Sequence, residues 1–61
     1  MKKNVIVFNF EKGLTLECNA SDLQYQLLVT IPSFIKENNV NLVSILKKSS
    51  QGSETLFNLS F

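Results

Sequence analysis

Apolar and polar residues alternate through the first third of the chain. Residues 4–10 have isoleucine or phenylalanine at every second position and residues 14–19 have leucine or cysteine there, which predicts two β-strands. Between them lies Glu11-Lys12-Gly13, and glycine is the residue that best tolerates the left-handed backbone of a tight turn. The two segments therefore read as a β-hairpin.

Its register follows from the side-chain faces. A two-residue loop at Lys12-Gly13 would mix apolar and polar side chains on one face. A three-residue loop, made of a type I turn and a bulge with Gly13 in the left-handed conformation, makes that face wholly apolar. Because a slip of one residue would destroy this face, we expect the second register. It pairs Phe10 with Leu14, Phe8 with Leu16, and Ile6 with Cys18.

The segment 22–35 fits two patterns. As one long helix, it would be capped by Ser21 with Gln24 three residues later, and its large apolar residues would form a single stripe. As a strand over 23–30, it alternates, contains a β-branched run, and precedes Pro32, which favours extended geometry in the residue before it. We favour the strand, followed by a short helix over 32–38. The single long helix stays open.

Two further strands are predicted over 41–48 and 54–61, joined by a loop of serine, glutamine and glycine. If Lys48 faces Glu54, then Ile45 faces Phe57 and Val43 faces Leu59. The fold class that follows is mainly β, a small α+β protein of one domain spanning residues 1–61. The element order is antiparallel β-β-β-α-β-β with one short helix.

These strands carry more apolar side chains than one core face can hide. A chain of 61 residues buries only about 60% of its unfolded surface, so it needs additional stabilisation. Cys18 is the only cysteine and there is no histidine, which leaves oligomerisation as the expected source. We predict a homo-oligomer interface from the residues on the second face: Val5, Val7, Leu28, Leu42, Leu46 and Leu56.

Composition argues against catalysis. Without histidine the chain lacks the commonest general base and metal ligand. Its carboxylates fall at predicted turns or on polar strand faces: Glu11, Glu17, Asp22, Glu37 and Glu54. Cys18 lies on the apolar face, where a thiol is unreactive. We expect no catalytic residues, no metal and no cofactor.

Charge and hydropathy bear on partners and location. The net charge is +1 and every cation is lysine, so the arginine that reads phosphates and bases is missing. Binding to nucleic acid or to a membrane surface is therefore not expected. The apolar run near the start is interrupted at Asn9 and Glu11, which is unlike a secretion signal, and no segment could span a membrane. A lone free cysteine fits the cytoplasm.

Two other functions stay open. Five strands with a helix after the third is also the order of the OB-fold, whose aromatic side chains stack on single-stranded nucleic acid. Its contacts here would be Lys2, Lys3, Tyr25, Lys47 and Lys48. A small-molecule binder with its sites between subunits is the other alternative.

One stretch resembles a known group of proteins. Residues 25–38, YQLLVTIPSFIKEN, followed by residues 41–48, NLVSILKK, look like small prophage proteins of the YonK type. The resemblance implies a phage-borne accessory protein that self-associates. Together with the second apolar face, it leads us to expect a non-enzymatic interaction module that binds or blocks a host or competitor protein.

Overall fold

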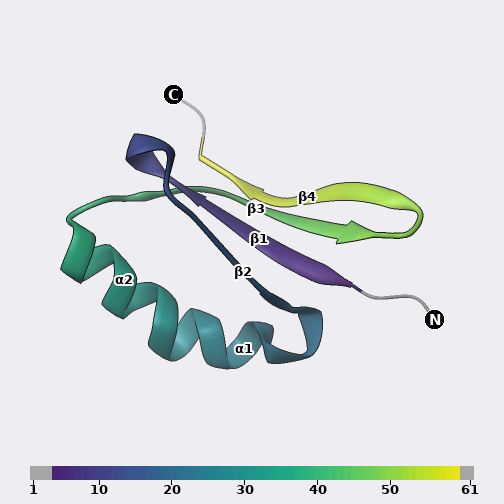
Figure 1. Cartoon of the computed structure of the whole chain (residues 1–61), viewed down its shortest axis with the longest axis horizontal. Coiled ribbons are helices and arrows are strands. Elements are labelled where there is room, and N and C mark those ends of the chain that lie inside the picture. Colours follow the sequence, from purple (N-terminus) through teal and green to yellow (C-terminus); the bar gives the residue numbers. More distant parts are fainter. Residues whose placement is uncertain (1–3, 60–61) are drawn as a thin grey trace.

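The computed structural model describes residues 4–59, which form one antiparallel sheet and one helical segment (Figure 1). The sheet has the order β2-β1-β3-β4. Its strands are β1 (Val5–Phe10), β2 (Thr15–Asn19), β3 (Leu42–Ser49) and β4 (Gly52–Asn58). The predicted class, a small and mainly β member of the α+β proteins, is confirmed. The predicted element order is wrong, because one of the five expected strands is helical.

The first hairpin has the predicted register. Phe8 pairs with Leu16 and Ile6 with Cys18. At its end, the Phe10 amide donates to the Leu14 carbonyl at 2.8 Å. The turn itself differs from the prediction in one respect, since Lys12 (φ 65°) as well as Gly13 (φ 77°) has a left-handed backbone.

The strand predicted over 23–30 is wrong, and the helical alternative is correct. After a 3-10 turn (Ala20–Asp22), the helix runs through α1 (Leu23–Tyr25), a π-helical turn (Gln26–Thr30) and α2 (Ile31–Asn38). The N-cap positions of these segments are Asn19 and Asp22, and neither makes a side-chain capping hydrogen bond, so the cap predicted at Ser21 is not formed.

The π-helical turn explains how the helix continues past a proline. Pro32 has no N–H to donate to the residue four positions earlier, and in a regular α-helix its ring would crowd that carbonyl. Directly before it, the Ile31 amide bonds to the Gln26 carbonyl, five residues back. This wider turn loosens the backbone where the proline ring needs room. Pro32 thus lies in the first turn of α2, a position that suits it.

The second hairpin is tighter than predicted. Ile45 pairs with Phe57 as expected, but the pairing of Lys48 with Glu54 is wrong, because Lys47 faces Glu54. The register shifts between Ile45 and Leu46, which leaves Leu56 as an extra residue in β4. The loop shortens accordingly, and Ser49 pairs with Gly52.

A second bulge changes the face of one predicted interface residue. Between β1 and β3 the pairs change from Asn9–Ser44 to Phe10–Leu42, so that Val43 is the extra residue. Leu42 therefore turns toward the core and packs against it. Its predicted place on the opposite face was wrong, because strict alternation fails at a bulge.

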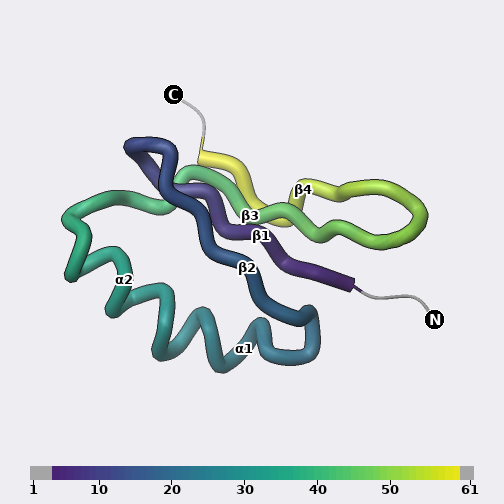
Figure 2. The backbone as a smooth tube through the Cα atoms, viewed as in Figure 1, coloured from purple at the N-terminus to yellow at the C-terminus, as the bar shows by residue number. Residues whose placement is uncertain are grey.

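The core lies between the helix and the β1–β2 half of the sheet. Its buried residues are Ile6, Phe8, Phe10, Ile31, Val40 and Ile45. The rings of Phe10 and Phe34 lie 4.7 Å apart, which joins α2 to β1. The backbone in Figure 2 shows the β3–β4 hairpin extending away from the helix. The helix therefore covers only part of one sheet face.

Candidate interaction surface

The outward side of the helix carries a row of apolar side chains. Leu28 is 70% exposed, Tyr25 61% and Val29 45%. Pro32, one turn further on, is also exposed. We call these four residues (Tyr25, Leu28, Val29 and Pro32) the outer helix stripe. All four are exposed on the same helical segment, which includes the π-helical turn.

The inward side of the same helix is apolar as well. Ile31 is buried, and Leu23, Phe34 and Ile35 pack against the core. A helix that is apolar on both sides is normally enclosed on both sides. Here the sheet encloses only one. The outer helix stripe is therefore the strongest candidate for an interaction surface in the part of the chain that the structure describes.

Sequence reasoning found only part of this stripe. It placed Leu28 in the interface, on the outer face of a strand, whereas the residue lies on the helix. It included Tyr25 only among the contacts of the nucleic-acid alternative, and it included neither Val29 nor Pro32 in a predicted site. The signal was present in their helical spacing, but it is visible only once the segment is read as a helix.

A smaller apolar patch lies on the sheet face turned away from the helix. Val7 pairs with Leu46 across β1 and β3, and Val5 lies two residues before Val7. These three residues form the far-face patch. Val7 is only 6% exposed, while Val5 and Leu46 are half-buried. Glu17, the β2 partner of Val7, borders the patch. Little apolar area is left open here.

The edge strand β4 offers a third apolar region. Every residue of this strand is exposed. Leu56 is 44% exposed and Phe57 43%, and the nearby Leu59 donates its amide to the Val43 carbonyl at 2.8 Å. We call Leu56, Phe57 and Leu59 the β4 cluster. Its outer backbone edge is open to pairing, as sheet edges are.

The six predicted interface residues thus do not form one continuous surface. Leu28 lies on the helix, Leu42 packs on the core and Leu56 lies in the β4 bulge. Val5, Val7 and Leu46 do lie together, as the far-face patch. The two bulges and the helix place these residues on different surfaces, whereas strict alternation would have placed them on one face.

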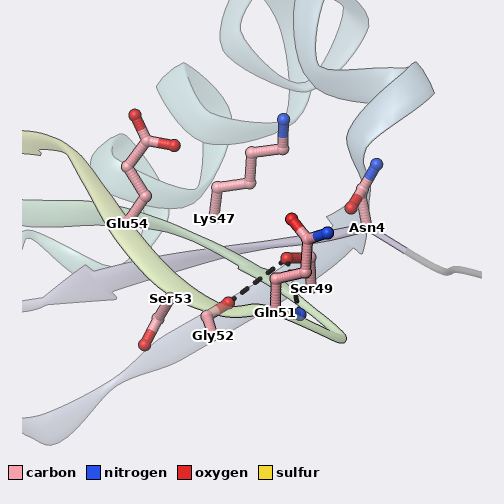
Figure 3. A pocket seen from close by; sticks show the side chains of 7 residues that line it. All are labelled: Asn4, Lys47, Ser49, Gln51, Gly52, Ser53 and Glu54. Atoms are coloured by element: carbon pink, nitrogen blue, oxygen red, sulfur yellow. Dashed lines mark hydrogen bonds between the residues drawn. The ribbon is translucent and has the colours of Figure 1, made fainter.

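A polar hollow lies beside the β3–β4 turn (Figure 3). It is lined by Asn4, Lys47, Ser49, Gln51, Gly52, Ser53 and Glu54. Lys47 and Glu54 are cross-strand partners and extend to the same side. The Ser49 hydroxyl accepts from the Gln51 amide at 3.3 Å and donates to the Gly52 carbonyl at 3.4 Å. The turn satisfies these groups internally, and the opposite charges leave no net charge to attract an anion.

Cys18 carries the one thiol of the chain. It is half-buried and packs against the core cluster. Burial raises the pKa of this thiol, and the negative charge of Asp22 raises it further. Both effects reduce the fraction of reactive thiolate at neutral pH.

The residues proposed for nucleic-acid binding are dispersed. Lys2 and Lys3 lie outside the described residues. Tyr25 is on the helix, whereas Lys47 and Lys48 are adjacent in β3 and therefore point to opposite sheet faces. Residues 4–59 contain four strands, not the five that suggested an OB-fold.

Glu11 has a structural partner, because its carboxylate accepts from the backbone and side-chain nitrogens of Asn41 at 3.0 and 3.3 Å. Among residues 4–59, no three histidine, cysteine or acidic side chains lie close enough to share a metal ion. Within these residues, no helix has the length and apolar character needed to cross a membrane.

Comparison with known proteins adds no relative to this picture. No family model matches the chain, and neither a curated protein nor a solved structure is significantly similar to it.

Proposed function

We propose that this protein is a non-enzymatic interaction module that self-associates through the outer helix stripe. The observation that carries the proposal is a helix with apolar side chains on two sides and a cover on only one. Burying a large apolar side chain contributes about 1.5–3 kcal/mol. A chain of this length gains much from such a contribution, since its own core is small.

The assembled particle would then act on a second protein. Self-association through the helix leaves the β4 cluster open, and β4 can also offer its backbone edge for strand pairing. The mechanism is occlusion by surface complementarity, and it requires no chemical step. An accessory or inhibitor protein of phage type, directed against a host or competitor protein in the cytoplasm, is the role that fits this mechanism and the resemblance over residues 25–48.

Solution mass tests self-association directly. We expect light scattering at micromolar concentration to give a dimer or larger species for the unaltered chain. Leu28→Asp places a charge in the centre of the stripe and should shift the mass to that of a monomer.

Leu56→Asp is the matched control, because it makes the same exchange at another exposed leucine. It should leave the mass unchanged. Loss of assembly in Leu56→Asp but not in Leu28→Asp would move the contact to β4. A folded monomer for the unaltered chain, over the whole concentration range, would remove self-association from the proposal.

A further inference from the structure

In the sequence, the four residues of the outer helix stripe are placed symmetrically about the point between Leu28 and Val29. Tyr25 and Pro32 lie at its ends, and Leu28 and Val29 lie at its centre. When two copies of a helix pack antiparallel about a two-fold axis, residues whose numbers have a constant sum lie opposite one another. With the axis between Leu28 and Val29, Tyr25 faces Pro32 of the partner subunit. Each stripe then covers the other completely, as a contact between identical surfaces requires.

Two charges bracket the stripe and lie within one residue of the same symmetry, since their residue numbers sum to 58 and those of the stripe pairs to 57. Asp22 is exposed one turn before Tyr25, and Lys36 is exposed one turn after Pro32. In the antiparallel arrangement, Asp22 of one copy lies near Lys36 of the partner subunit, and this happens at both ends. The arrangement therefore contains two attractive pairs, and charges of the same sign do not face each other at these positions. A parallel arrangement would place each charge near its own kind.

A dimer contact has to be compared with the size of the chain. A standard interface covers about 800 Å² on each partner. The chain exposes 4532 Å², so such a contact would use about a sixth of it. From Leu23 to Asn38 the helix is about 24 Å long at the usual rise of 1.5 Å per residue. The four apolar side chains of the stripe lie within this length.

We propose that two copies of the chain pair through their outer helix stripes, antiparallel about a two-fold axis between Leu28 and Val29, with Asp22 of each facing Lys36 of the partner subunit. This inference rests on the proposed function, since it specifies the self-association suggested there. It commits to a second copy as the occupant because a foreign partner would not require the stripe and its flanking charges to be self-complementary.

Charge reversal tests the arrangement. Asp22→Lys and Lys36→Asp each turn two attractions into two repulsions. Each variant alone should dimerise about tenfold more weakly than the unaltered chain at low salt. An equimolar mixture of the two variants should regain the affinity, because every contact between unlike subunits is again attractive. The double variant D22K/K36D should regain it as well. Sedimentation equilibrium measures the affinities, and native mass spectrometry identifies the mixed dimer.

The rescue separates pairing from folding. Each reversal also places a charge unfavourably on the helix dipole, but this effect persists in the mixture and in the double variant. A loss of dimer caused by a damaged helix would therefore not be restored. Salt should diminish the differences between variants.

The two proposals fail in different ways. A monomeric unaltered chain would overturn both. A dimer that withstands both single reversals, or that the mixture does not restore, would overturn the antiparallel arrangement and leave self-association intact.

Discussion

At the scale of single residues, Cys18 shows how the fold alters side-chain chemistry. The thiol is half-buried against the core, and Asp22 lies near enough for its charge to act on it. Both influences oppose ionisation, so the pKa of the folded thiol lies above that of the unfolded chain. The folded state therefore favours the protonated thiol.

This has a consequence for reactivity and for stability. At about pH 8, iodoacetamide should modify Cys18 more slowly in the native protein than in the chain unfolded by urea. Because the folded pKa is raised, the contribution of the thiol to stability is complete below the unfolded pKa. It is lost as pH rises through the folded pKa. Mass spectrometry of quenched samples measures the modification.

Asp22→Asn serves as the control for Cys18. It removes the smaller of the two influences and should accelerate modification by less than unfolding does. Equal rates in the native and unfolded chains would contradict this account of Cys18.

At the scale of elements, the C-terminus of the helix depends on one residue with a left-handed backbone conformation. Asn39 has φ 53° and ψ 49°, and its amide bonds to the Ile35 carbonyl. The Val40 amide donates to the same carbonyl at 3.3 Å. This left-handed turn brings Val40, which is only 2% exposed, into the core. Asparagine takes the role that glycine more often fills at such a position.

Substitution of Asn39 should reveal that requirement. Asn39→Ala is expected to lower the free energy of unfolding by about 1 kcal/mol, whereas Asn39→Gly should preserve it or raise it slightly. Urea unfolding at matched protein concentration measures both variants.

Asn38→Ala is the neighbouring control. Asn38 belongs to α2, and its side chain makes one exposed hydrogen bond to the Phe34 carbonyl. Its replacement should change stability by less than about 0.5 kcal/mol. A larger loss in Asn38→Ala than in Asn39→Ala would show that the left-handed backbone is not what limits this end of the helix.

At the scale of the whole molecule, self-association should appear in thermal stability. If the native state is a dimer, its melting temperature depends on protein concentration by mass action. For a chain of this size we expect a rise of roughly 5–10 °C for a hundredfold increase in concentration. Leu28→Asp should remove most of this dependence, and Leu56→Asp should keep it. A melting temperature independent of concentration would argue against a dimeric native state.

The alternation of the sequence determined a large part of the architecture. The first hairpin has its predicted register because any other would expose Phe8 or bury Glu17. The second hairpin keeps the predicted pair of Ile45 and Phe57. Alternation of this kind acts locally, and it identifies strands and their inner faces wherever the ladder is regular.

The features that only the tertiary structure decided lie where the strand and helix patterns of the sequence become irregular or ambiguous. Residues 23–31 satisfy both a strand and a helix pattern, and the effect of Pro32 on the residue before it favoured the strand. The helix forms because a π-helical turn accommodates the proline while Ile31 and Phe34 pack on the sheet. Likewise, the bulges that turn Leu42 to the core and set Leu56 apart depend on contacts with other strands. The candidate surface depends on the same helix, because rotation about its axis, set by core packing, determines which apolar residues remain outside.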